Sequence, residues 1–134
     1  KLEKRITEIL PIEWMLPAIG QGAIGIETRA GDEATLSRIQ HLHDPLTWDC
    51  LLAERSLLAE LEGNCELPLA GYCILNGEEL FLRAFIGDSE GKIQLRYEAS
   101  APRQNALQLG KDVALWLLKN GGEEILLRAV DAEK

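Results

Sequence analysis

The chain has 134 residues, of which 46% are hydrophobic and 27% charged, as is typical of one globular domain or of a domain with part of another. Asp and Glu number 22 against 14 Lys and Arg, which gives a formal net charge of −8. An acidic surface repels phosphates, so we expect no nucleic-acid partner. No apolar run approaches the roughly 20 residues that a membrane span needs, so we expect no membrane partner.

The cysteine count points to a reducing compartment. The chain has 3 cysteines and no Cys-x-x-Cys pair, which does not suit a disulfide framework. The first residues, Lys1 to Ile9, mix acids with bases and contain no unbroken apolar stretch, unlike a signal peptide. We therefore expect a cytoplasmic protein.

Residues 1–43 have the pattern of a piece of a larger structure rather than of a complete domain. The glycine-rich stretch predicts a tight loop at Gly20–Gly22 followed by a buried strand at Ala23–Thr28, where apolar residues follow one another. A helix over residues 32–43 follows, with Asp32 as its N-cap. No neighbouring strand lies nearby in the sequence to pair with the predicted one.

Residues 44–134 predict a complete α+β domain. Asp44-Pro45 suits the N-cap and first position of an amphipathic helix that runs to Glu62, and Gly63 ends it. A long helix with Gly110 on its buried side lies near the end of the chain. Between these two helices the sequence predicts three strands with turns at Asn76-Gly77 and 88–91; their ranges are 67–76, 79–87 and 92–100.

This order gives the fold class that we expect. Three antiparallel strands have one face to bury, and two amphipathic helices can cover it. The long helix spans about 103–120 and buries Leu107 among others, and Glu123–Val130 is a helix or a final strand. We therefore predict an α+β fold with a three-stranded antiparallel sheet covered by two main helices, preceded by a strand-and-helix remnant in residues 1–43.

The loop around Cys65 is the sharpest chemical feature. The sequence Leu61-Glu-Gly-Asn-Cys-Glu-Leu-Pro-Leu69 places this cysteine between a helix end and a strand start. A thiol reacts as thiolate, and the flanking acids and the negative helix end disfavour that form. The residues alone therefore leave both a passive thiol and a functional nucleophile open. Cys50, on an apolar helix stripe, and Cys73, in a strand, are interpreted as core residues.

Other candidate sites are weaker. His41 and His43 do not share a helix face, and no third ligand has suitable spacing, so we predict no metal site. A Cys–His hydrolase would require one of these histidines within hydrogen-bond reach of Cys65. The glycine loop lacks the Lys-Ser/Thr pair of a phosphate-binding loop. Glu54 and neighbouring charged residues are interpreted as the solvated helix face.

Four blocks of the chain form one joint pattern: Leu16-Pro-Ala-Ile-Gly-Gln-Gly-Ala-Ile-Gly-Ile-Glu-Thr-Arg29, Leu42-His-Asp-Pro45, Ala53-Glu-Arg55 and Leu61-Glu-Gly-Asn-Cys-Glu-Leu-Pro-Leu69. In order and spacing they resemble the C-terminal part of the porphobilinogen deaminase family. The similarity runs essentially from end to end of the chain. Long blocks in a fixed order are much more specific than any one of them.

The resemblance implies an activity and a cofactor. The family joins four porphobilinogen molecules head to tail into hydroxymethylbilane, with release of ammonia, in tetrapyrrole and haem biosynthesis. It has two α/β domains and a small α+β third domain, on which a loop cysteine carries dipyrromethane through a thioether. By resemblance that cysteine is Cys65. Residues 44–134 would be this cofactor-attachment domain, and residues 1–43 a remnant of the second and first domains.

The resemblance also implies roles for other residues. Gln21 and Gly22 match the family's loop near cofactor or substrate carboxylates. Arg29 and Arg55 match family arginines, which could bind those carboxylates or form ion pairs between domains. Asn64 stands where the family commonly has a second glycine, a small departure because Asn tolerates positive φ.

The family's catalytic aspartate and most of its carboxylate-binding arginines lie outside the matched positions. We therefore expect no catalytic residue in this chain and no activity of the chain alone. A non-catalytic binding module derived from the same domain is the alternative. The predicted strand Ala23–Thr28 would have open edges, so we expect strand exchange or edge pairing in a homodimer. An isolated, exposed coil at these residues would contradict that expectation.

Overall fold

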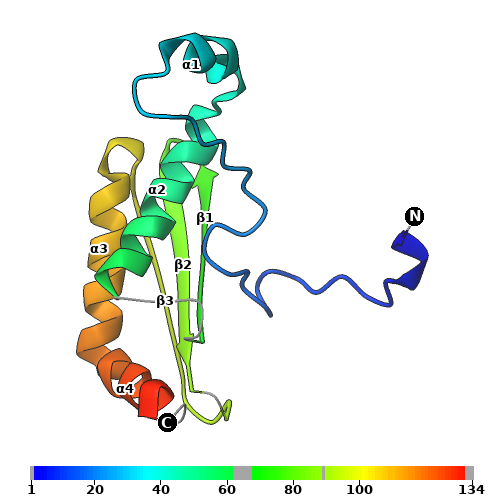
Figure 1. Cartoon of the computed structure of the whole chain (residues 1–134). Helices are drawn as coiled ribbons and strands as arrows, with labels where there is room; N and C mark the ends of the chain where they lie inside the picture. Colours follow the sequence, from blue (N-terminus) through cyan, green and yellow to red (C-terminus); the bar gives the residue numbers. More distant parts are fainter. Residues whose placement is uncertain (1, 62–67, 89, 132–134) are drawn as a thin grey trace.

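The computed structural model of the chain describes residues 2–61, 68–88 and 90–131. An N-terminal segment up to His43 is mostly loop, with one helix, α1 (Glu33–Ile39). From Pro45 onward the chain forms a layered unit of sheet and helices. The beginning of the N-terminal segment extends away from this unit, whereas its later part runs beside β1 (Leu69–Asn76) and α2 (Pro45–Glu60) (Figure 1). The α+β class is confirmed.

The sheet has three antiparallel strands in the order β1-β2-β3. They span Leu69–Asn76, Glu79–Gly87 and Gln94–Pro102. Pairing of Asn76 with Glu79 makes Gly77-Glu78 the two-residue turn between the first two strands, with φ +66° at the glycine. The turn is thus centred one residue later than the expected Asn76-Gly77 pair.

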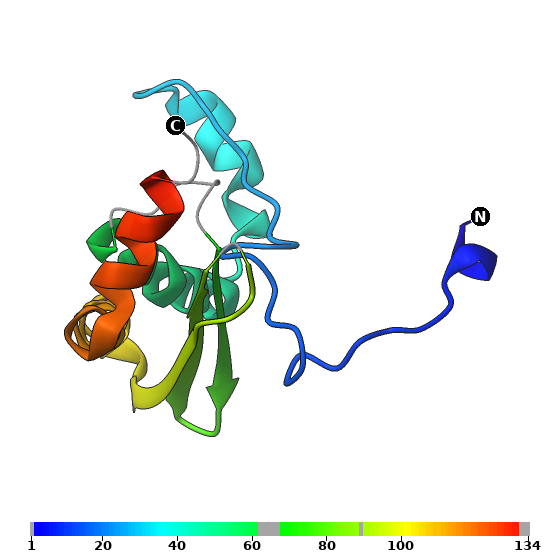
Figure 2. The same cartoon turned by 90° about the horizontal axis from the view of Figure 1, so that it is seen from below.

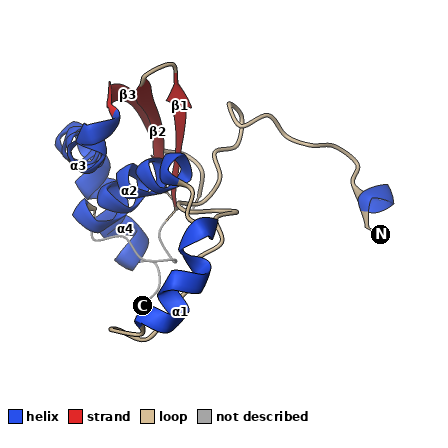
Figure 3. Cartoon of the chain, turned by 90° about the horizontal axis from the view of Figure 1, so that it is seen from above, coloured by secondary structure: helices blue, strands red, loops and turns tan. Residues whose placement is uncertain are grey.

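Three helices gather on one side of this sheet (Figures 2 and 3). The helix α2 (Pro45–Glu60) packs on β1, α3 (Ala106–Leu117) packs on β3, and α4 (Glu123–Asp131) contacts β2. Short 3₁₀ turns and one π-type turn complete the helical elements: Glu3–Arg5, Gln40–Leu42, Arg103–Asn105 and Leu118–Gly122. The two main helices are as predicted, and the final apolar segment is a helix rather than a strand.

Side-chain caps begin both helices of the first half, as predicted. The Asp44 carboxylate accepts a hydrogen bond from the backbone N–H of Thr47 at 2.8 Å, at the start of α2. The Asp32 carboxylate accepts one from Thr35 N–H at 3.1 Å, at the start of α1. Each bond satisfies a donor that the first helical turn leaves without a partner. Because Asp32 and Asp44 are typical capping residues, the first residues of α1 and α2 could be predicted from the sequence.

The core lies between the sheet and α2 and α3. Alternate residues of β2 point into it and are fully buried, and the complete buried apolar set is Ala53, Leu57, Leu61, Cys73, Leu80, Leu82, Ala84, Ile86, Ala106, Leu109, Val113, Ala114, Leu117 and Ile125. Leu107, expected on the buried side of α3, is 53% exposed. Leu109 is buried instead, while Val113, expected on the same side, is buried as predicted. The interpretation of Leu107 was therefore wrong.

Helices α2 and α3 approach each other most closely at Gly110. A β-carbon there would lie 2.7 Å from the backbone nitrogen of Leu57 and from the Ser56 β-carbon. The Ser56 hydroxyl donates to the Leu107 carbonyl at 2.7 Å beside this crossing. Only glycine permits this separation, so Gly110 determines how near α2 lies to α3.

The predicted strand at Ala23–Thr28 is wrong. These residues form an exposed coil, and Ile24 is 92% exposed. A strand forms only where a neighbouring strand accepts and donates its backbone hydrogen bonds, and within the described ranges the segment pairs with none. The strand-exchanged dimer was expected only because of this strand, and that premise is lost.

No helix in the described part of the chain combines the length and apolar content that a membrane crossing requires.

We expect Gly110→Ala to destabilise the chain by about 1–3 kcal/mol, because the added methyl group pushes the two helices apart. Urea unfolding measures the change. Gly25→Ala is the control, since a β-carbon at Gly25 meets nothing within 4 Å, and its effect should stay within about 0.5 kcal/mol. Equal stability of the two variants would contradict the close approach of α2 and α3.

Candidate functional site

The candidate site lies where the glycine loop meets α2 and β1. Two successive turns shape the loop: Gln21 N–H donates to the Ala18 carbonyl at 3.0 Å, and Ala23 N–H donates to the Gly20 carbonyl at 3.2 Å. Gly20 and Gly22 have φ of +72° and +82°. Residues with a β-carbon rarely adopt such positive φ angles, so both turns depend on glycine. The expected tight loop at Gly20–Gly22 is confirmed.

A buried carboxylate on α2 holds this loop. Glu54 is only 6% exposed. One of its oxygens, Oε2, accepts from the Gly20 N–H at 2.8 Å, and the other, Oε1, accepts from the Cys73 N–H at 2.8 Å. The interpretation of Glu54 as part of a solvated helix face is therefore wrong. Its spacing from Cys50 and Leu57 places it on the buried stripe, which is the signal that could have revealed it.

Burial raises the pKa of Glu54 above its usual range. The two backbone N–H groups stabilise the carboxylate and act in the opposite direction, but burial has the larger effect. Cys50 and Cys73 also face this carboxyl group, and burial raises the pKa of both thiols. Both thiols therefore remain protonated at neutral pH.

The same contacts cover the free edge of the sheet. The strand β1 lies at the edge, and its outward donors at Gly71 and Cys73 bond to the Pro17 carbonyl at 3.2 Å and to Glu54. Ile19 packs against the core, and a β-carbon at Gly71 would lie 3.0 Å from its side chain. The loop therefore occupies the edge at which another chain could otherwise pair.

An open groove of about 380 Å³ lies beside this contact. It is lined by both loop residues that the sequence singled out, Gln21 and Gly22, together with Thr47, Cys50 and Glu54 among others. The described lining contains one acid and no Lys or Arg. The groove can thus offer amide and hydroxyl hydrogen bonds, but it supplies no positive charge of its own.

The two predicted arginines do not line this groove. Arg29 contacts the Asp32 carboxylate at 3.2 Å, beside the start of α1, and its side chain is 90% exposed. Arg55 is exposed on α2. The structure therefore brings Gln21 and Gly22 together and leaves Arg29 and Arg55 apart from them.

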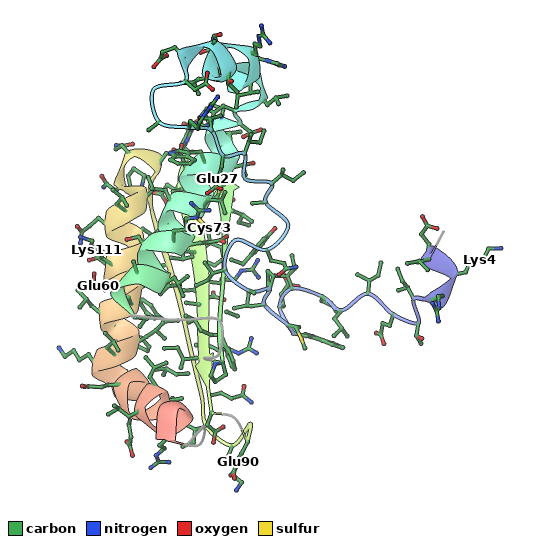
Figure 4. All side chains as sticks on the ribbon, viewed as in Figure 1. Lys4, Glu27, Glu60, Cys73, Glu90 and Lys111 are labelled. Carbon is green, nitrogen blue, oxygen red and sulfur yellow. The ribbon has the colours of Figure 1, made fainter. Side chains whose placement is uncertain are left out.

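Cys65 lies outside the described residues, so the structure does not test its role. The structure describes the other two cysteines. Cys73 is buried on β1 (Figure 4), and Cys50 is half-buried on α2 and packs against the core. Both lie in contact with apolar neighbours, as the sequence predicted.

The histidines occupy the connection between α1 and α2. His41 lies in the 3₁₀ turn, and the His43 ring contacts Trp48 edge-on, with ring centroids 5.8 Å apart. Across residues 2–61, 68–88 and 90–131, no group of three or more His, Cys, Asp or Glu side chains is arranged to hold a metal ion.

Arginines on the outer sheet face, which sequence reasoning missed, bind the N-terminal segment. Arg83 donates to the Glu13 carboxylate and Arg96 donates to the Glu13 carbonyl, each at 3.2 Å. The Arg83 guanidinium also lies 5.6 Å from the ring centroids of Tyr72 and Phe81. Strand alternation alone places both arginines on this face, but nothing in the sequence indicates Glu13 as their partner.

Comparison with known proteins divides the chain into two matched parts. A family model described as "Porphobilinogen deaminase, C-terminal domain" matches residues 48–119. A second model, described as "Porphobilinogen deaminase, dipyromethane cofactor binding domain", matches residues 1–37.

Curated relatives agree with these matches. A porphobilinogen deaminase of Chlorobium phaeobacteroides strain DSM 266 / SMG 266 / 2430 is 45% identical over 131 residues, and that of strain BS1 is 44% identical over 126 residues. The alignments cover 94% and 91% of this chain but 42% and 40% of those relatives. The chain thus spans about two fifths of the length of the curated relatives it matches.

The raised pKa of Glu54 predicts that the contribution of this residue to the free energy of unfolding depends on pH. A carboxyl group with a higher pKa in the folded than in the unfolded chain binds its proton more readily when folded, so its contribution to stability falls as pH rises between the two values. The free energy of unfolding of the unchanged chain, minus that of Glu54→Gln, should therefore fall as pH rises from about 4.5, the ordinary value. The slope should not exceed about 1.4 kcal/mol per pH unit.

Urea unfolding of both proteins between pH 4 and 8 measures this difference. Glu60→Gln removes a charge from the far end of the same helix, and it serves as the control for net charge. A difference that rises with pH would contradict the raised pKa.

Proposed function

Because the chain belongs to the porphobilinogen deaminase family, we propose that it is the cofactor-bearing, C-terminal part of an enzyme that joins four porphobilinogen molecules into hydroxymethylbilane with release of ammonia. The match of residues 48–119 to the family's C-terminal domain carries the C-terminal assignment, and the model that matches residues 1–37 names the dipyromethane cofactor. The three-stranded α+β fold supports it, because the resemblance implied that architecture for the cofactor-attachment domain.

We assign the attachment of dipyrromethane to Cys65. The resemblance implies this cysteine, and the packing of the other two supports the choice, since Cys73 is buried in the core and Cys50 packs against it. The electrophile is the azafulvene-like species that forms when porphobilinogen loses ammonia. The sulfur forms a C–S bond to its methylene carbon, and the thiol proton leaves. So strong an electrophile does not require a preformed thiolate.

Gln21 and Gly22 are proposed to donate hydrogen bonds to carboxylates of the cofactor or substrate. Their place in the open groove supports this role, since the side-chain amide of Gln21 and the backbone N–H of Gly22 are donors that suit carboxylate oxygens. Arg29 and Arg55 are proposed to form carboxylate or interdomain contacts, and their exposed positions away from the groove favour the latter.

The proposed division is a cofactor-attachment domain at 44–134 and a remnant of the other two domains at 1–43. The two family models, which change over between residues 37 and 48, support this boundary. A cytoplasmic location is proposed with it. We prefer the deaminase function to a non-catalytic binding module because both matched models and both relatives carry the deaminase name.

Intact-mass measurement and peptide mapping test the assignment of Cys65. We expect the complete gene product, made in cells that supply porphobilinogen, to carry an added mass of two linked pyrrole units on the peptide that contains Cys65. Cys65→Ser should lose the added mass and porphobilinogen consumption, whereas Cys50→Ser should keep the added mass. An adduct on a different cysteine, or none at all in the active protein, would contradict the assignment.

The chain by itself should release no ammonia from porphobilinogen, because the resemblance places the family's catalytic aspartate outside the matched positions. The complete gene product, assayed at the same concentration, should release ammonia. Measurable release by the chain alone would show that catalytic groups lie within these 134 residues.

A further inference from the structure

The position of the glycine loop depends on Glu54, a side chain of α2 that the sequence did not single out as a site residue. Gly20 directly precedes Gln21, and its N–H donates to Glu54 Oε2 at 2.8 Å. Both Gln21 and Gly22 are exposed, and a β-carbon at Gly22 would meet nothing within 4 Å. The packing around these two residues is therefore loose, and their place is determined by the anchored residue before them.

We propose that Glu54 is a positioning residue that holds the Gln21–Gly22 loop at the groove by binding Gly20 and β1 at the same time. Its two oxygens accept one backbone N–H each, from segments 53 residues apart in the sequence, Gly20 and Cys73. The carboxylate thus ties Gly20, the residue next to Gln21, to the sheet edge. Its role toward bound carboxylates rests on the proposed function, whereas its role in holding the loop does not.

A carboxylate suits this task better than any neutral side chain of the same size. Both partners are donors, and a carboxylate offers two acceptor oxygens. The glutamine side chain offers one oxygen and one N–H₂ donor, so one of the two backbone N–H groups would face another donor. Cys73 lies within a paired strand, whereas Gly20 lies in a loop that can move. The loop contact is therefore the one that glutamine would lose.

Pro17 and Ile19 also attach the segment, through the Gly71 hydrogen bond and through apolar packing. These contacts lie before Gly20, and the turn bond from Gln21 N–H to the Ala18 carbonyl, which spans Gly20, joins the loop only to itself. Loss of the Glu54 contact should thus release Gly20–Gly22 while the residues up to Ile19 stay in place. A local change of this kind can be distinguished from general unfolding.

Amide hydrogen exchange of the chain, followed by NMR, is the first test. We expect Glu54→Gln to lower the protection of the Gly20 amide at least ten-fold and to leave the Leu82 amide of β2 within two-fold. Glu60→Gln, on the same helix, should change neither. Unchanged protection at Gly20, or an equal fall at Gly20 and Leu82, would overturn the proposal. If Glu54→Gln does not fold, Glu54→Asp is used, since it keeps both oxygens but shortens their reach.

Kinetics of the complete gene product are the second test. A displaced loop should raise KM for porphobilinogen about three- to ten-fold and change kcat by less than two-fold, because uniform binding contacts affect KM. A merely structural role would lower the active fraction, and so the apparent kcat, with KM unchanged; that result would overturn the proposal for the reaction. If the unaltered protein does not consume porphobilinogen, the proposed function fails, and hydrogen exchange still tests the loop contact.

Discussion

The arrangement of this chain depends on one buried carboxylate. Glu54 joins the loop before Gln21 to the edge of the sheet through two hydrogen bonds of 2.8 Å. The helix α1, by contrast, buries no residue, and most apolar side chains of residues 2–31 are exposed. The N-terminal part therefore acquires its place on the α+β unit at Glu13, which Arg83 and Arg96 bind, and at Pro17–Gly20, where a backbone carbonyl, an apolar side chain and this carboxylate act together.

Packing elsewhere determines where that carboxylate lies. Gly110 lets α3 approach α2 at Ser56 and Leu57, and the Arg103 side chain bonds to Asp49 at 2.9 Å and fastens the first half of α2 to the start of α3. With α2 fixed in this way, Glu54 reaches the outward N–H of Cys73 on β1. Burial of a charge is costly, as the raised pKa shows, and the two charge-assisted hydrogen bonds offset part of that cost.

The elements predicted correctly from the sequence are those set by local signals. Asp44-Pro45 marks the start of α2, alternation marks β2, and glycines mark the loop at Gly20–Gly22. The errors share a non-local cause. Ala23–Thr28 has strand-like composition but no strand beside it, and Glu54 has a charge typical of the surface but partners 34 and 19 residues away. Composition describes a residue's preference, and only the fold supplies its partner.

The acidic character of the chain is compatible with a site for an anionic, covalently held cofactor. A groove with Glu54 and without Lys or Arg in its described lining gives little electrostatic attraction for carboxylates. Under the proposed function a covalent tether would remove the need for such attraction, because a bonded group cannot dissociate and requires only orientation. Both oxygens of Glu54 accept backbone donors, so the remaining polar groups of the described lining are neutral, among them the Gln21 side-chain amide. Attachment and orientation are thus proposed for different residues, and the buried acid, which also caps a donor of the sheet edge, would act on the loop that orients.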